Sequence, residues 1–202
     1  ALVAGTDAPS SANGAFGNAA SAIALTDAGT AADNVALLIG GAYEIARSVT
    51  VANNGSGTVT LGGSTADSSL FSGAIALNKA VTLQAAAGGT VEFTSVWTAN
   101  NQAVAIGSAG STGTVKLVST LATGGGVTVN FGTLLVAGTL DSSVNVDAAG
   151  TLGGTGSAGA LILDGTINPA TDGTMGTLTL AGATFNTNST FDGRDVSTDG
   201  AK

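Results

Sequence analysis

The sequence of 202 residues contains no cysteine and no histidine, and only 2 residues are proline. Without cysteine there is no disulfide framework or thiolate nucleophile, and without histidine there is no imidazole base or zinc site of the ordinary ligand set. Positive charge is scarce as well, because 5 lysines and arginines stand against 13 aspartates and glutamates, for a formal net charge of -8. Such a chain offers no basic patch, so we expect neither nucleic acid nor anionic lipid as a partner.

Long apolar runs and aromatic residues are also missing. The most apolar stretch, residues 34–47, is interrupted by Gly40, Gly41 and Glu44, and it falls short of the roughly 18 apolar residues that a membrane-spanning helix needs. Aromatic residues make up 4% of the chain, whereas 44% of residues are hydrophobic and 32 are glycine. Moderate hydrophobicity with very little charge predicts an ordered protein with a narrow core of small aliphatic side chains, and no membrane insertion by this chain.

A short phrase recurs along the chain: glycine, threonine, a branched aliphatic residue, a variable residue and a second apolar residue. Full copies begin at Gly57, Gly89, Gly113, Gly132 and Gly176, and truncated copies begin at Gly138, Gly150 and Gly165. Within a copy, threonine and the variable residue alternate with the aliphatic residues, which is the two-residue period of a strand with one buried face. We therefore expect outward side chains at the alternating positions Thr60, Glu92, Lys116 and Thr179.

The spacing of the phrases distinguishes among all-β folds. The copies recur at irregular intervals of roughly ten to thirty residues and are not paired around Asn-Gly hairpin turns. This favours a solenoid, in which each coil contributes two or three short strands that pair in parallel with the coils above and below. The sequence predicts an all-β, right-handed parallel β-helix with corners rich in Gly, Asn and Asp. Residues 22–202 are expected to form one solenoid domain, and residues 1–21 an extended lead-in or a first partial coil.

Residues 31–47 allow a second interpretation, because their Ala, Leu, Ile and Glu content suits an amphipathic helix that would cap the solenoid. Against a helix, Gly40 and Gly41 lie in the middle of the segment, and each glycine costs about 1 kcal/mol relative to alanine in a helix. We therefore predict strands over residues 35–39, 42–45 and 48–51, with a turn at the glycine pair.

The C-terminal part resembles a known repeat. Residues 150–159 read GTLGGTGSAG, residues 161–169 read LILDGTINP and residues 176–182 read GTLTLAG. These segments resemble the passenger-associated repeat of bacterial autotransporter proteins, over residues 132–190. The resemblance implies coils of a right-handed β-helix displayed outside the cell. The sequence departs from the repeat after Pro169, where Ala170-Thr171-Asp172-Gly173 replaces the usual Gly-Asn-Ser.

The resemblance implies an extracellular or bacterial cell-surface location. The membrane barrel of an autotransporter is absent, so we expect either a released passenger piece or a solenoid exported by another route. Residues 1–5 lack the basic start and apolar centre of a signal peptide, as a mature chain would. Bacterial surface-layer and fibre proteins are a neighbouring class with a similar low-complexity composition.

Candidate catalytic groups are few. Glycoside hydrolysis needs two nearby carboxylates, but Glu44 and Glu92 lie inside expected strands with no acidic cluster, and no acids are grouped near Lys79 or Lys116. The segment Asp192-Gly193-Arg194-Asp195 suggests either a carbohydrate or calcium site or, as we favour, a turn with a local ion pair, like the other Asp-Gly turns at residues 164, 172 and 199. We predict no catalytic, metal or cofactor-binding residue and expect no enzyme.

Two further features have structural interpretations. The glycine groups at 62–63, 88–89 and 124–126 are followed by no Gly-Lys-Ser/Thr sequence, so we interpret them as corners of the solenoid and not as phosphate loops. Trp97, with Phe93 on the same alternating face, is either an exposed platform for carbohydrate stacking or, as we favour, part of the core or of an end cap.

The resulting hypothesis is a structural or adhesive module of a bacterial surface. The polar stretch of residues 191–196 is a poor cover for an apolar solenoid end, so we expect the chain to associate with itself, end to end or by strand donation. A carbohydrate-binding adhesin, which would recognise glycans or a host surface, and a polysaccharide-degrading enzyme on the same fold are the alternatives.

Overall fold

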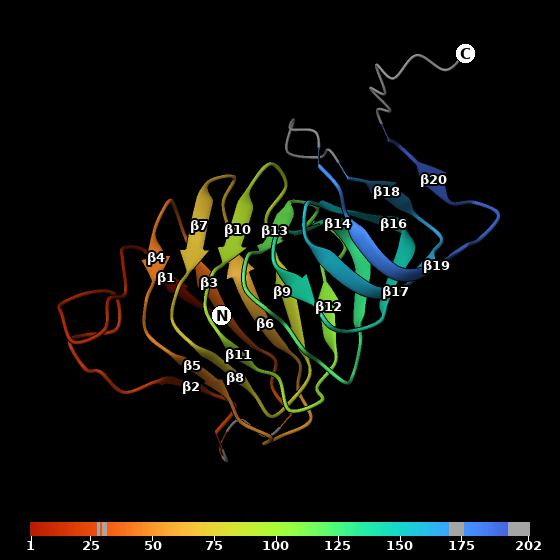
Figure 1. Ribbon diagram of the computed structural model, residues 1–202. Helices are drawn as coiled ribbons and strands as arrows, with labels where there is room; N and C mark the ends of the chain where they lie inside the picture. The colour runs from red at the N-terminus through yellow and green to blue at the C-terminus, as the bar shows by residue number, and fades with distance from the viewer. Residues whose placement is uncertain (28, 30–31, 170–175, 194–202) are drawn as a thin grey trace, which may run out of the picture.

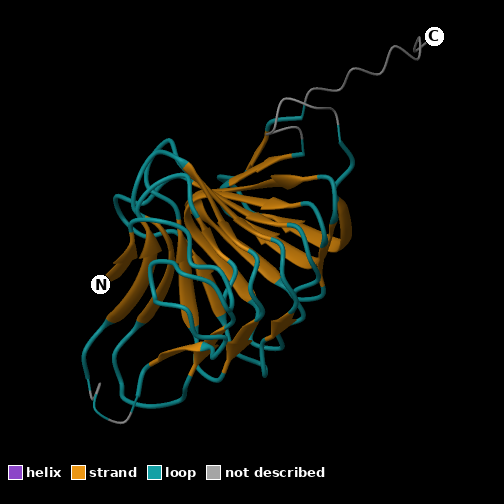
Figure 2. Cartoon of the chain, turned by 90° about the vertical axis from the view of Figure 1, so that its left-hand side faces the viewer, coloured by secondary structure: helices purple, strands orange, loops and turns teal. Residues whose placement is uncertain are grey.

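The computed structural model describes residues 1–27, 29, 32–169 and 176–193, and these residues form a parallel β-solenoid of about 7 turns without a helix. The chain winds repeatedly through three sides, and strands of successive coils lie side by side (Figure 1). Figure 2 shows the same stack of strands from its left-hand side. Every listed strand pair is parallel, as the phrase spacing predicted.

We call the first side the face that begins with β1. It is formed by β1 (Leu2–Ala4), β3 (Val35–Ile39), β6 (Val59–Gly63), β9 (Val81–Gln84), β12 (Val104–Ile106), the first parts of β14 (Val127–Val136) and β16 (Val144–Gly154), and the last parts of β17 (Ser157–Leu163) and β19 (Thr179–Phe185). One inward column runs through all of them: Leu2, Leu37, Leu61, Leu83, Ile106, Val129, Val146, Leu163 and Phe185. This column is the backbone of the core.

The second side follows the first around a corner. It is formed by β4 (Glu44–Ile45), β7 (Ser68–Phe71), β10 (Thr90–Phe93), β13 (Thr114–Leu117), the last parts of β14 and β16, β18 (Thr166–Asn168) and β20 (Thr190–Phe191). Five copies of the glycine-threonine phrase stack here, so that Thr90, Thr114, Thr133, Thr151 and Thr166 form one outward column.

The third side closes each coil. A separate four-stranded sheet contains β2 (Ile23–Leu25), β5 (Val49–Val51), β8 (Ile75–Leu77) and β11 (Trp97–Thr98), and farther along the axis the side continues with β15 (Thr139–Leu140) and the first parts of β17 and β19. The phrases at Gly138 and Gly176 belong to this side, because Thr139 and Thr179 both pair with Ser157.

The glycine of the phrase is required where coils approach closely at a corner. A Cβ on Gly113 would lie 2.1 Å from the carbonyl oxygen of Ala86, and Gly132 combines a similar close approach with a φ of +68°. An alanine would clash in the first case and be strained in both. The phrase is therefore a corner glycine followed by a strand.

The core narrows along the axis. From Leu37 to Val129 the column advances by 22 to 24 residues per coil, and then by 17 residues per coil, from 129 to 146 and from 146 to 163. The wide coils hold the stacked rings of Phe71 and Phe93, with centroids 4.9 Å apart. In the narrow coils, the matching column on the second side ends in Val136 and Gly154. Smaller side chains fill the smaller coils, which is why the chain needs few aromatic residues.

Residues 31–47 confirm the strand interpretation. β3 covers residues 35–39, a bend lies at Gly41, and β4 and β5 follow on the next two sides. Of the glycine groups, 88–89 and 124–126 lie at turns as predicted, whereas the prediction for 62–63 is wrong, because both residues belong to β6. Gly62 needs its small size there, since a Cβ would lie 1.9 Å from the carbonyl oxygen of Gln84 in the next coil.

Candidate functional site

The alternation predicted for the phrases is confirmed on the outside of the solenoid. Thr60, Glu92 and Lys116 are half-buried and Thr179 is exposed, whereas their strand neighbours Leu61, Val91 and Val115 are buried. The outward threonines of the second side repeat at the strand spacing of about 4.8 Å. They give this flank a regular row of hydroxyl groups with little charge.

Trp97 lies inside the solenoid. Its side chain is 8% exposed, and its ring centroid lies 5.4 Å from that of Phe93. The core interpretation is therefore confirmed, and the alternative of an exposed carbohydrate platform is wrong. Burial has left the indole Nε1 without a hydrogen-bond partner, so this residue offers nothing to an external ligand.

The two glutamates lie on one outward column of the second side, a relationship that their positions in the sequence do not reveal. Glu44 and Glu92 both pair with Leu70, one coil to either side. Two strand spacings place their Cα atoms roughly 9–10 Å apart. Each carboxylate already has a partner within the chain, because Ser72 donates a hydrogen bond to Glu44 and Lys116 Nζ lies 3.2 Å from Glu92 Oε2.

The expectation that no acid is grouped near Lys116 is therefore wrong. Glu92 and Lys116 are 24 residues apart in sequence but occupy the same position of adjacent coils. Their side chains are 34% and 37% exposed. An ion pair at this exposure contributes about 0–1 kcal/mol, so it adjusts the register of two coils and does not form a site.

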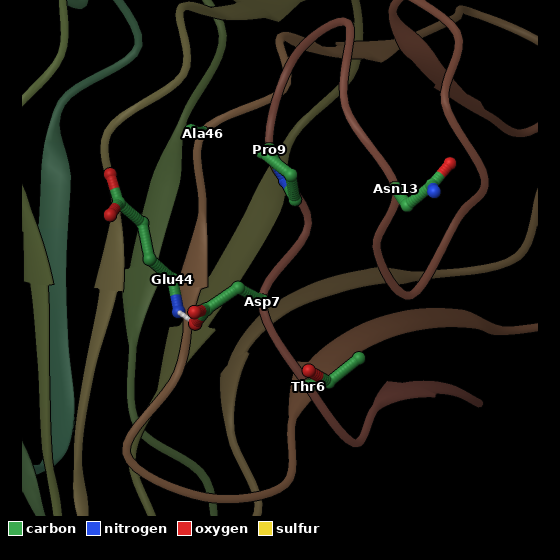
Figure 3. A pocket seen from close by; sticks show the side chains of 6 residues that line it. All are labelled: Thr6, Asp7, Pro9, Asn13, Glu44 and Ala46. Atoms are coloured by element: carbon green, nitrogen blue, oxygen red, sulfur yellow. Dashed lines mark hydrogen bonds between the residues drawn. The ribbon is translucent and has the colours of Figure 1, made fainter.

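A polar cavity of about 290 Å³ lies beside the first coil, and Figure 3 shows the residues that line it, which are Thr6, Asp7, Pro9, Asn13, Glu44 and Ala46. Asp7 Oδ1 accepts a hydrogen bond of 2.9 Å from the backbone nitrogen of Glu44. The carboxylate of Glu44 points away from that of Asp7 (Figure 3). The two acids therefore do not converge on a common ligand position.

The acidic segment at residues 192–195 is only partly described. Asp192 Oδ2 accepts a hydrogen bond of 3.0 Å from the side chain of Asn168. Arg194 and Asp195, and with them the expected ion pair, lie outside the described residues, as do the Asp-Gly turns at 172 and 199. In the described ranges, no three carboxylates are grouped so that they could hold a metal ion.

The two ends of the solenoid differ in how their inward residues are covered. In the first coil, Ala4 and Ala8 are 0% and 1% exposed, and Ile23 and Leu25 of β2 are buried as well. In the last coil, by contrast, Phe185 is 54% exposed and Phe191 64% exposed, although both occupy inward columns.

The cover of the first coil is the loop of residues 9–22, whose Ala15 and Phe16 pack against the core. Arg47, which is 5% exposed, fastens this loop: its Nη1 donates to the carbonyl oxygen of Phe16 at 2.6 Å and its Nη2 donates to that of Ser21 at 2.6 Å. We call residues 9–22 the N-terminal cap. Sequence reasoning missed it, since Arg47 is the sole signal and lies 26 residues from Ser21.

Comparisons with known proteins leave the function to be argued from this geometry. No family model matches the chain, and searches of curated proteins and of solved structures gave no match. Within the described ranges there is also no helix that could span a membrane.

Proposed function

We propose that this chain is a stiff structural module of a bacterial cell surface, which presents weakly charged polar flanks and associates with further copies through an open end. The observation that carries the proposal is the inward column that runs without a break from Leu2 to Phe185. Consecutive coils are joined along it by backbone hydrogen bonds and by stacked apolar side chains, and this continuity makes a rod resistant to bending and to proteolysis.

The surface location and the autotransporter-like origin belong to the proposal. Support comes from the resemblance over residues 132–190, whose segments form the narrow coils built by β14, β16 and β17. The composition agrees with it, because the chain has no cysteine and few cations. We also propose that the chain has no catalytic activity, since its two outward glutamates each contact a partner side chain and have Leu70 between them.

The test combines shape, resistance and binding. The purified chain is examined by negative-stain electron microscopy at rising concentration, with and without calcium, and is treated with proteinase K in parallel. We expect short rods or assemblies of rods, slow digestion and no effect of calcium. The same preparation is applied to a glycan array and to a panel of acidic and neutral polysaccharides. Saturable glycan binding would replace the structural role by an adhesin, and depolymerisation would replace it by an enzyme.

A further inference from the structure

The last coil ends in an unpaired strand edge that lacks the usual protections. β19 is 7 residues long and extends over the third and first sides, and six of its residues are exposed. Natural edge strands are shielded by lysine, proline, bulges or covering loops, because a free edge is a template for another strand. The sequence of β19, TLAGATF, contains no charged residue and no proline.

This end is also the place where two acidic chains can meet with little repulsion. The chain carries a formal net charge of -8, yet β19 and the following β20, with the sequence TF, are uncharged. Phe185 and Phe191 add apolar surface that is more than half exposed. Contact at this end therefore buries aromatic side chains without burying like charges.

The other end is a poor partner for it. The N-terminal cap lies on the core there and is fastened by Arg47. Of the first coil, the exposed apolar residues are Leu2 and Val3, at 47% and 49%, on a strand of 3 residues. A head would thus meet a tail along one short strand, whereas a second tail offers the same uncharged edge of 7 residues together with both phenylalanines.

We propose that two copies of this chain associate tail to tail, with β19 of one copy pairing antiparallel to β19 of the other around a twofold axis. The contact is isologous and closes after two copies, whereas head-to-tail contact would repeat into a fibre. This inference rests on the proposed self-association and specifies its partner surface. The functional unit is then a double-length rod that shows a capped N-terminal end at both extremities.

The first experiment uses cross-linking, which is clean because the chain has no cysteine of its own. Ala183→Cys places one thiol on the exposed tail strand, Val3→Cys places one on the head, and Val96→Cys, at a flank position that is 74% exposed, is the control. Each full-length variant is treated with a short bismaleimide at concentrations where sedimentation velocity shows association. We expect covalent dimers from Ala183→Cys and monomers from the other two.

The second experiment tests symmetry by charge. Ala183→Lys and Ala183→Glu each place like charges together near the twofold axis, so each variant alone should dimerise about tenfold more weakly, and an equimolar mixture should recover the dimer. Val96→Lys and Val96→Glu are the matched controls and should dimerise like the unmodified chain.

The outcomes separate this inference from the proposed function. Fibres, or cross-links that form only when Val3→Cys is mixed with Ala183→Cys, would keep self-association and overturn the tail-to-tail contact. Monomers at every concentration tested would overturn both. A mixture of the two Ala183 variants that remains monomeric while the unmodified chain dimerises would overturn the symmetric contact alone.

Discussion

The rings of Phe71 and Phe93 stack in adjacent coils, with centroids 4.9 Å apart and an interplanar angle of 12°. They follow each other in the same inward column of the second side, and each is at most 1% exposed. Because parallel pairing repeats at about 4.8 Å, stacking of the rings and pairing of the strands require the same spacing. The two interactions therefore reinforce one another.

Removing one ring should leave a cavity that the stacked coils cannot close. We expect Phe93→Ala to lower the free energy of unfolding by about 3–5 kcal/mol, measured by chemical denaturation. Phe191→Ala is the matched control, because Phe191 is 64% exposed, and we expect a change of less than about 0.5 kcal/mol in the monomer. Equal losses in both variants would contradict the packing described here.

Two buried serines differ only in their hydrogen bonds. Ser142 is 6% exposed, donates to the carbonyl oxygen of Thr123 and accepts from its backbone nitrogen. Ser69 is 5% exposed, and its hydroxyl has no partner. We expect Ser142→Ala to destabilise the protein by about 1–2 kcal/mol and Ser69→Ala to be neutral or stabilising by about 1 kcal/mol. Thermal unfolding of the two variants would show opposite shifts, and a loss in Ser69→Ala would reveal an internal water or a missed partner.

Corner glycines should not tolerate a methyl group. Gly113→Ala would push a Cβ against the carbonyl oxygen of Ala86 at 2.1 Å, whereas Gly5→Ala meets no atom within 4 Å. We expect Gly113→Ala to cost more than about 2 kcal/mol and Gly5→Ala less than about 0.5 kcal/mol, because strain at a fixed backbone position exceeds the usual effect of a surface substitution. Denaturant midpoints with unchanged slopes test both. A mild effect at Gly113 would mean that the two coils can separate locally.

Arg47 should control the N-terminal cap without controlling the rest of the rod. Arg47→Met keeps the apolar stem but leaves the carbonyl oxygens of Phe16 and Ser21 without their charged donor, a loss of about 1.5–3 kcal/mol for each strong bond. We expect limited proteolysis to cleave within residues 9–22 and to spare the coils. Lys79→Met is the control, since Lys79 also donates to a backbone carbonyl, that of Gly55, but at an exposed position. Unchanged cleavage in Arg47→Met would show that the cap is held by Phe16 packing alone.

The sequence by itself determined the local structure. Alternation inside the glycine-threonine phrase has a period of two, and this period depends only on the geometry of a strand, so inward Val91 and outward Glu92 follow from their immediate neighbours. The scarcity of aromatic residues similarly indicated a narrow interior. Strands over residues 35–51 followed from the glycine pair, because a local penalty in a helix needs no knowledge of the fold.

The tertiary structure alone decided which phrase lies on which side and what each coil contacts. Copies at Gly57, Gly113 and Gly138 look alike, yet they lie on three different sides, because their places depend on the summed lengths of all intervening corners. The ion pair of Lys116 with Glu92 and the fastening of the N-terminal cap by Arg47 arise from the same winding. So does the difference between a covered first coil and an exposed β19, since an end is defined by which neighbour a strand lacks, and no local pattern records that.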